Sequence, residues 1–314
     1  MISLIQNENM KIFRRVGTWI MIALLMVIVI AGGVIEKVTS DDQQSNVNWK
    51  ASLQQQNQQM EQSLKEGQIP KIMVKTIKKD IAINQYRIEH DLDPFGHGAW
   101  ENVIDDAAIV GVVTLFTIII AGGSVASEFS WGTIKLLLIR PVNRSKILLS
   151  KYISTFIFAL ITLLILFVLS FIVGAVLFGF DTIGNPHLSY HAGKVVESNM
   201  FWHAIQVYGL ACVSLLMMVT FAFMISTIFR SSSLSIGIAI FLMFTGTQVT
   251  GLLATKFDWA KYILFANTDL TRYIDGIPLV EGMTMAFSVV MLILYFVVFN
   301  SLTWFIFKKR DVAA

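Results

Sequence analysis

The chain has 314 residues, of which 55% are hydrophobic and only 14% are charged. Soluble domains of ordinary composition carry roughly 25% charged residues, so this composition excludes a typical soluble protein and indicates a polytopic membrane protein. The net charge of +3 is too small to suggest a nucleic-acid partner, and the single cysteine, Cys212, excludes an intrachain disulfide framework.

Residues 1–15 predict a short helix that lies along the inner leaflet and turns into the first span. The stretch "MISLIQNENMKIF" places Ile2, Ile5, Ile12 and Phe13 on one side of a helix. The alternative is a frayed N-terminus. Since no convincing small-residue cleavage site follows the first apolar run, we expect an uncleaved span and not a signal peptide.

Six stretches are long and apolar enough to cross the hydrocarbon core, which takes about 20 residues of helix. They comprise residues 16–35, 107–126, 153–180, 201–229, 234–254 and 284–307. Because the backbone must satisfy its own hydrogen bonds in lipid, these stretches predict a helical bundle. The expected fold class is therefore an all-α polytopic membrane protein with six transmembrane helices.

The distribution of basic residues predicts the orientation of the bundle. With the N-terminus inside, the inner segments carry 12 Lys and Arg residues, whereas the two short outer loops carry four. Short loops rich in Lys and Arg stay in the cytoplasm. We therefore expect a multi-pass protein of a bacterial cell membrane with both termini cytoplasmic.

The long segment 36–102, which follows the first span, predicts an extracellular helical hairpin. Its first half is rich in glutamine and other good helix formers, and its second half spaces Val74, Ile77, Ile81 and Ile88 near the helical period. A glutamine-rich coil with little fixed structure is the alternative.

A second outer segment, 257–282, lies between the last two spans. Its aromatic residues suit the interface between membrane and water. We expect a short helix or a pair of helices that dips into the outer headgroup region.

Catalytic and metal-binding motifs are absent from the sequence. It contains no GxxxxGK[ST], HExxH, GxSxG or CxxC pattern. A loop offers His90, Asp91, Asp93 and His97, but their spacing matches no metal site. We therefore expect neither an enzyme nor a bound metal or cofactor.

The predicted third to sixth spans also lack Asp, Glu, Lys and Arg. Charged residues inside the bilayer usually mark proton relays and ion-coupling sites. Their absence argues against an ion-coupled transporter, so the energy for any transport is expected to come from elsewhere.

Uncharged polar residues do enter the predicted spans. The second span ends in "AGGSVA", and the fifth contains candidate pathway-lining residues, namely Thr245, Thr247, Gln248 and Thr250. Small and hydroxyl residues in spans favour close helix packing. The alternative, a polar lining of a translocation cavity, stays open for both spans.

The segment 127–151 is basic yet half apolar, and it is the largest predicted cytoplasmic segment. Gly132 and Thr133 can break the preceding helix, Pro141 can end a short helix, and Asn143 or Ser145 can cap the next one. We expect a short helix that lies flat on the cytoplasmic face and is hinged at both ends. The alternative is a basic anchor for anionic lipid.

Within this segment, Glu128, the pair Gly132-Thr133, Lys135, Pro141 and Arg144, followed by Lys151, resemble a pattern of the type-2 family of ABC transporter permeases. The pattern is E-x3-GT-x-K, a few apolar residues, P-x-x-R, and a lysine that opens the next helix. The resemblance implies that this segment is a coupling helix which docks on a separate ATPase subunit. The ATPase-coupling residues would be Glu128, Gly132, Thr133, Lys135, Pro141 and Arg144.

The same resemblance implies a permease subunit of an ATP-driven exporter, paired with itself or with a second permease. ATP and Mg²⁺ would be bound by the partner subunit. The long outer insertion resembles that of Gram-positive permeases implicated in bacitracin or lantibiotic self-protection and in sodium extrusion. The substrate would be hydrophobic or amphipathic, such as a lipid, a peptide antibiotic or a drug. The alternative function is a membrane sensor or scaffold whose outer hairpin binds a ligand.

Overall fold

The computed structural model describes residues 1–44, 48–66, 71–94, 98–130, 132, 143–180, 185–191, 193–229, 231–274, 278–280 and 282–309. The centre of the predicted coupling helix, including Thr133, Lys135 and Pro141, lies outside these residues.

Six helical stretches are long and apolar enough to cross a membrane, which confirms the all-α polytopic fold class. They are Val16–Thr39, Ala99–Glu128, Arg144–Phe178, Met200–Ile228, Ser232–Ala254 and Met285–Lys309. The elements that supply them are α2 (Val16–Gln44), α5 (Ala99–Asp105) with η1 (Asp106–Ile109), α6 (Val110–Ser124) and α7 (Ala126–Ser130), α9 (Arg144–Phe178), α10 (Met200–Ile228), α11 (Ser232–Ala254) and α13 (Met285–Lys309).

Two of these stretches begin eight or more residues earlier than the sequence predicts. The second begins at Ala99 instead of residue 107, and α9 begins at Arg144 instead of residue 153. The hydropathy pattern ends where polar residues begin, but a helix continues wherever those residues find partners. Asn102, for example, donates to the carboxylate of Asp106 and to the carbonyl oxygen of Ser170, at 3.2 and 2.8 Å.

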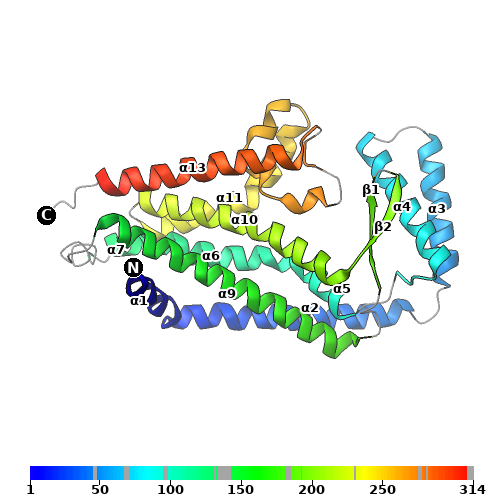
Figure 1. Cartoon of the computed structure of the whole chain (residues 1–314), viewed down its shortest axis with the longest axis horizontal. Helices are drawn as coiled ribbons and strands as arrows, with labels where there is room; N and C mark the ends of the chain where they lie inside the picture. The colour runs from blue at the N-terminus through cyan, green and yellow to red at the C-terminus, as the bar shows by residue number, and fades with distance from the viewer. Residues whose placement is uncertain are drawn as a thin grey trace.

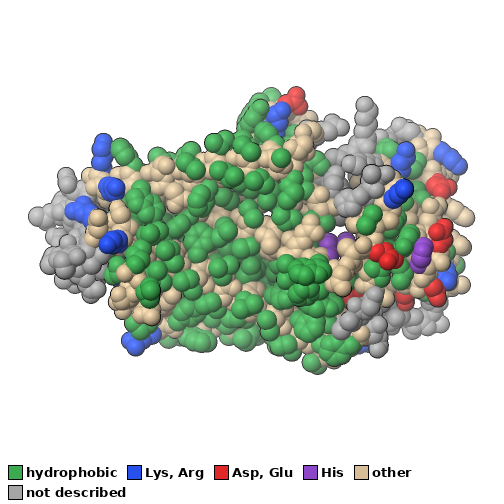
Figure 2. All heavy atoms as spheres, in the orientation of Figure 1, with side chains coloured by type: hydrophobic (Ala, Val, Ile, Leu, Met, Phe, Trp, Pro, Cys, Tyr) green, Lys and Arg blue, Asp and Glu red, His purple; other side chains and the backbone are tan. Residues whose placement is uncertain are grey.

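The six membrane-spanning stretches run along the long axis of the molecule (Figure 1). Helix α10 contacts α6, α11 and α13, whereas α9 contacts α2, α5 and α6. The main core cluster fills the space between these helices with fully buried side chains, among them Leu25, Val113, Phe158, Leu166 and Val219. Large apolar side chains also cover the outside of the bundle, with charged residues at its two ends (Figure 2). An apolar exterior is what lipid requires.

Small residues allow several of these helices to approach closely. A Cβ atom on Gly122 of α6 would lie 2.8 Å from the Ile236 side chain of α11. A Cβ on Gly174 of α9 would lie 2.9 Å from the Cα atom of Ala99 in α5. In the second span, Gly122 therefore serves helix packing, as the "AGGSVA" pattern favours.

At the end of the bundle away from the termini lies a second unit that includes two antiparallel helices, α3 (Trp49–Glu66) and α4 (Lys71–His90) (Figure 1). The buried amide of Asn84 donates to the Asn57 side chain at 2.9 Å and joins the two helices. The predicted helical hairpin is thus present, whereas the glutamine-rich coil is not.

Between the third and fourth spans, where the sequence patterns predicted no element, the chain forms a β-hairpin. Strand β1 (His187–His191) pairs antiparallel with β2 (Lys194–Ser198), with Ser189 opposite Val196. Gly193 takes the left-handed conformation that the tight turn needs, with φ of 87°. The hydroxyl of Tyr86 in α4 donates to the carboxylate of Glu197 at 3.0 Å, which joins this hairpin to the helical one.

The segment before the last span folds into η2 (Asp258–Tyr262), α12 (Leu264–Asn267) and η3 (Leu270–Tyr273). Asn267 is fully buried there. It donates to the carbonyl oxygens of Lys261 and Ile263, and its own side-chain oxygen accepts from Ser288 of α13 at 2.8 Å. These bonds fasten the segment to the last membrane-spanning helix.

Candidate functional site

The N-terminal helix α1 (Ile2–Phe13), α7 and the start of α9 meet at the end of the bundle that carries both chain termini (Figure 1). Helices α7 and α9 are the two ends of the predicted coupling segment. Their junction with α1 is therefore the part of the candidate ATPase-coupling site that the structure describes.

Four charged side chains from these three helices form one ion network. The Lys151 ammonium of α9 lies 2.9 Å from Oε2 of Glu8 and 2.9 Å from Oε1 of Glu128. The Lys11 ammonium lies 2.8 Å from Oε1 of Glu8 and 3.1 Å from Oε1 of Glu128. Each lysine thus bridges the same two carboxylates, so α1, α7 and α9 are joined electrostatically at one point.

Most of this network is shielded from solvent. The Lys151, Glu128 and Glu8 side chains are 5%, 11% and 14% exposed, whereas Lys11 is 45% exposed. Burial lowers the pKa of Lys11, but the hydrogen bonds and negative charges of Glu8 and Glu128 outweigh that effect and raise the pKa above 10.5. The network holds two positive and two negative charges, and this balance is what makes its burial tolerable.

A buried serine fixes the position of α7. The Ser226 hydroxyl of α10 accepts hydrogen bonds from the backbone N–H groups of Val125 and Ala126, at 3.3 and 3.0 Å. Those residues lie at the break between α6 and α7, where the helix ladder is interrupted. Ser226 therefore supplies the acceptor that the break removes, and it holds Glu128 facing the network.

Hydroxyl groups also tie α1 to the bundle. The Ser154 hydroxyl of α9 donates to the carbonyl oxygen of Ile5 at 3.2 Å, and Thr18 of α2 donates to that of Ile12 at 2.6 Å. The rings of Phe13 and Phe158 pack with centroids 6.0 Å apart. The predicted N-terminal helix thus contacts α9 through Ile5, Glu8 and Phe13.

The predicted coupling residues fall into two groups. Glu128 lies in the network, Gly132 is exposed with a left-handed φ of 71°, and Arg144 is the half-buried first residue of α9. Asn143 occupies the N-cap position of α9 as expected, although its side chain makes no capping hydrogen bond. Thr133, Lys135 and Pro141 lie outside the described residues.

The roles of Glu8 and Lys11 and the burial of Lys151 were not predicted from the sequence. Glu8 and Lys11 are three residues apart, which is typical of an exposed pair on a helix surface. The signal for Lys151 was present, because it shares the helical stripe of Leu148, Thr155 and Phe158, all buried. A lysine on a buried stripe predicts a carboxylate partner.

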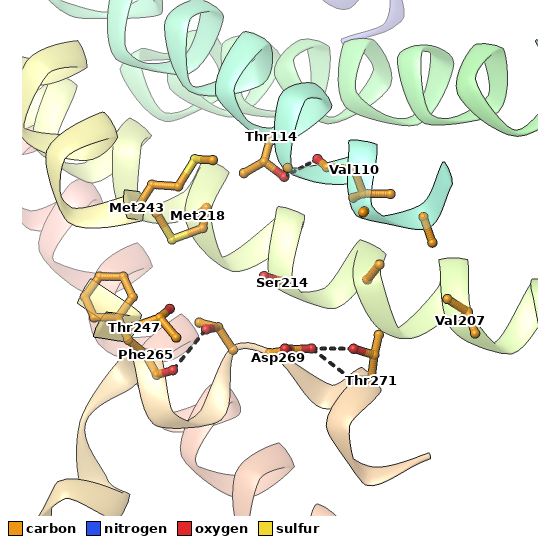
Figure 3. Close-up of a pocket in the computed structure, with 15 residues that line it drawn as sticks. Val110, Thr114, Val207, Ser214, Met218, Met243, Thr247, Phe265, Asp269 and Thr271 are labelled. Atoms are coloured by element: carbon orange, nitrogen blue, oxygen red, sulfur yellow. Dashed lines mark hydrogen bonds between the residues drawn. The ribbon is translucent and has the colours of Figure 1, made fainter. Parts of the chain in front are cut away.

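A cavity of about 340 Å³ opens between α6, α10, α11 and the short helices before α13 (Figure 3). Polar groups in its wall include those of Thr114, Ser214, Thr247 and Asp269, and Met218 and Met243 supply thioethers. The Asp269 carboxylate already has hydrogen-bond donors. It accepts from the backbone N–H and the hydroxyl of Thr271 (Figure 3), and from the guanidinium of Arg272, which lies outside the cavity, at 2.9 Å.

The four candidate pathway residues do not share one environment. Thr247 lines the cavity (Figure 3). Thr250 is buried and donates to the carbonyl oxygen of Gly246, the half-buried Thr245 donates to that of Phe241, and Gln248 is exposed. Within the described part of the chain, no group of three or more His, Cys, Asp or Glu residues could hold a metal ion.

Comparisons with known proteins place this architecture in a family. "Uncharacterized protein YhcI" of Bacillus subtilis is 48% identical over the full length of both chains. "Uncharacterized membrane protein YdbK" of the same organism is 32% identical over 62% of this chain and 76% of its own length. Residues 96–313, from just before the second membrane-spanning stretch to the C-terminus, match the family model described as "Protein of unknown function (DUF2705)". The chain therefore belongs to the DUF2705 family.

Proposed function

We propose that this protein is the permease subunit of an ATP-driven exporter of the bacterial cell membrane, and that a separate ATPase subunit docks on segment 127–151. The observation that carries the proposal is the ion pair between Glu128 and Lys151, at 2.9 Å. These two residues lie at the two ends of that segment, and both are bound to α1. A push on the segment would therefore reach α6, α9 and α1 together.

In this proposal, both termini and the ion network face the cytoplasm, and the α3–α4 hairpin faces outward. In Figure 2 the charged side chains visible at the end that carries the termini are Lys and Arg, whereas the opposite end shows both signs, and this difference supports the orientation. Two permease subunits, identical or related, would enclose the pathway, and the 340 Å³ cavity lined by Thr247 would lie along it. Its mixed apolar and hydroxyl lining suits a hydrophobic or amphipathic substrate.

Cross-linking tests where the ATPase docks. A Lys135→Cys variant, in a Cys212→Ser background, should form a cross-link to a co-expressed nucleotide-binding subunit. A Lys65→Cys control, at the end of α3, should form none. ATP hydrolysis should require both subunits. If Lys135→Cys gives no cross-link while the two proteins co-purify, docking on this segment is wrong.

Export measurements test the network itself. Glu128→Gln should reduce substrate export while ATP hydrolysis by the assembled complex continues. Lys65→Gln, a substitution of an exposed residue at the end of α3 and outside segment 127–151, should leave both rates unchanged. Equal export by wild type and Glu128→Gln would show that the network does not transmit the push.

The outer hairpin favours a second candidate function, a membrane sensor or scaffold. Its two helices are fastened to the β-hairpin by the hydrogen bond between Tyr86 and Glu197, so they form a fixed surface beyond the bundle. A protein of this class would co-purify from membranes without an ATPase.

A further inference from the structure

A second cavity, of about 550 Å³, lies between the helical hairpin and the β-hairpin. Its wall is formed by side chains of α3, α4, β1 and the start of α10. Ligand sites in proteins commonly enclose about 300–1,000 Å³, so the cavity is large enough for a small organic molecule. It is separate from the ion network, which lies at the opposite end of the molecule, where α1 and α7 meet (Figure 1).

The wall combines charged and apolar groups. Lys79 and Asp80 are adjacent on α4, Arg87 lies about two turns further along the same helix, and the apolar lining includes Leu53 and Leu188. Lys79 and Asp80 have interaction partners of their own. The remaining question is which group binds the guanidinium of Arg87.

The Arg87 guanidinium is half-buried and, among the residues that the structure describes, makes no hydrogen bond or salt bridge. Burial lowers the pKa of Arg87, and the negative charge of Asp93 offsets this effect only in part. A guanidinium group carries five N–H donors. A ligand that brings acceptor oxygens into the cavity would give these donors protein-bound partners in place of water.

The cavity walls are held in place before any ligand arrives. The buried Asn57–Asn84 bond fixes α3 against α4, and the Tyr86–Glu197 bond fixes α4 against the β-hairpin. Tyr86 and Arg87 are neighbours on α4, so the bond to Glu197 also restricts the backbone that carries the guanidinium. Such preorganisation lowers the entropic cost of binding.

We propose that this cavity binds an organic anion, with a phosphate or carboxylate group on Arg87 and an aliphatic portion against Leu53, Leu188 and their apolar neighbours. Planar guanidinium groups match such oxyanions through two parallel hydrogen bonds. The anion is the headgroup of an outer-leaflet lipid or a soluble amphiphile. The inference goes beyond the exporter proposal and needs no ATPase.

Calorimetry on the full chain in phosphatidylcholine nanodiscs, with hexyl phosphate as the probe, tests the site. The wild type should bind the probe saturably, and Arg87→Gln should weaken binding at least tenfold. Lys78→Gln removes one charge from the exposed side of the same helix and should leave the affinity within twofold. Absence of saturable binding to the wild type, or equal affinity for Arg87→Gln, overturns the proposal.

Two further measurements complete the test. In discs that contain phosphatidylglycerol, a lower apparent affinity indicates that a lipid headgroup already occupies the site, whereas an unchanged affinity indicates a soluble ligand. If Arg87→Gln fails to fold, phenylglyoxal labelling of the wild type replaces it. Hexyl phosphate should protect Arg87, and not Arg272, from this arginine-specific reagent, and unprotected Arg87 overturns the proposal.

Discussion

The ion network at the junction of α1, α7 and α9 predicts a large effect of one uncharged substitution, Lys151→Met. Methionine keeps most of the length and apolar stem of lysine but removes the ammonium. The substitution leaves Lys11 bridging the carboxylates of Glu8 and Glu128, which are 14% and 11% exposed. The summed charge of these four residues changes from zero to −1 in largely buried surroundings.

Removing one partner of a buried ion pair typically costs about 3–5 kcal/mol of stability, because the other charge stays buried without compensation. Here Lys11 remains 2.8 Å from Glu8 and 3.1 Å from Glu128 and compensates in part. We therefore expect a loss near the lower end, about 3 kcal/mol. Unfolding in mixed micelles with increasing sodium dodecyl sulfate, followed by tryptophan fluorescence, measures this loss.

The double variant Lys151→Met/Glu128→Gln restores charge balance, because one lysine and one glutamate remain. It should be no less stable than Lys151→Met alone. Lys146→Met, the same substitution at an exposed position of α9, should change stability by less than about 0.5 kcal/mol. Equal losses from Lys151→Met and Lys146→Met would refute the assigned role of the network.

Three further predictions concern single contacts. Ser226→Ala removes the acceptor for the Val125 and Ala126 N–H groups and should cost about 1–3 kcal/mol in the same unfolding assay. Gly246→Ala places a Cβ 2.6 Å from the Phe265 ring and should cost about 1–3 kcal/mol through overpacking. Because the pKa of Lys11 is raised, its contribution to α1 docking is complete below pH 10.5 and is lost as the pH rises through the shifted value. The rate at which a protease cleaves α1 should therefore be constant from about pH 7 to 9 and increase only above about pH 10.5.

Each of these predictions has a control. Ser124→Ala removes a hydroxyl that only returns to the carbonyl oxygen of Ala121, so it should cost less than Ser226→Ala. Gly237→Ala, on the same helix as Gly246, places its Cβ in open space and should be tolerated. Lys11→Met should abolish the alkaline increase in proteolysis, and an unchanged increase would contradict the role of Lys11.

Local sequence patterns predicted most of the fold. Apolar length located the six membrane-spanning helices, and helical spacing located the α3–α4 hairpin. The predicted ends of the helices were less accurate. Polar residues such as Asn102 and Lys151 can extend a helix into the bundle only when groups distant in the sequence pair with their side chains. The pairing of the β-hairpin 187–198 is local, but its contact with α4 joins residues more than 100 positions apart, such as Tyr86 and Glu197, and no local pattern shows that contact.

The sequence by itself determined that this chain is a membrane protein, because each of its six apolar stretches is long enough to cross the hydrocarbon core as a helix. It also singled out Glu128, through a family resemblance and not through any visible partner. Only the tertiary structure showed that Glu128 meets Glu8, Lys11 and Lys151, and that Arg87 faces a cavity. Both are contacts between segments distant in the chain, and hydrophobic periodicity carries no information about which charges such segments bring together.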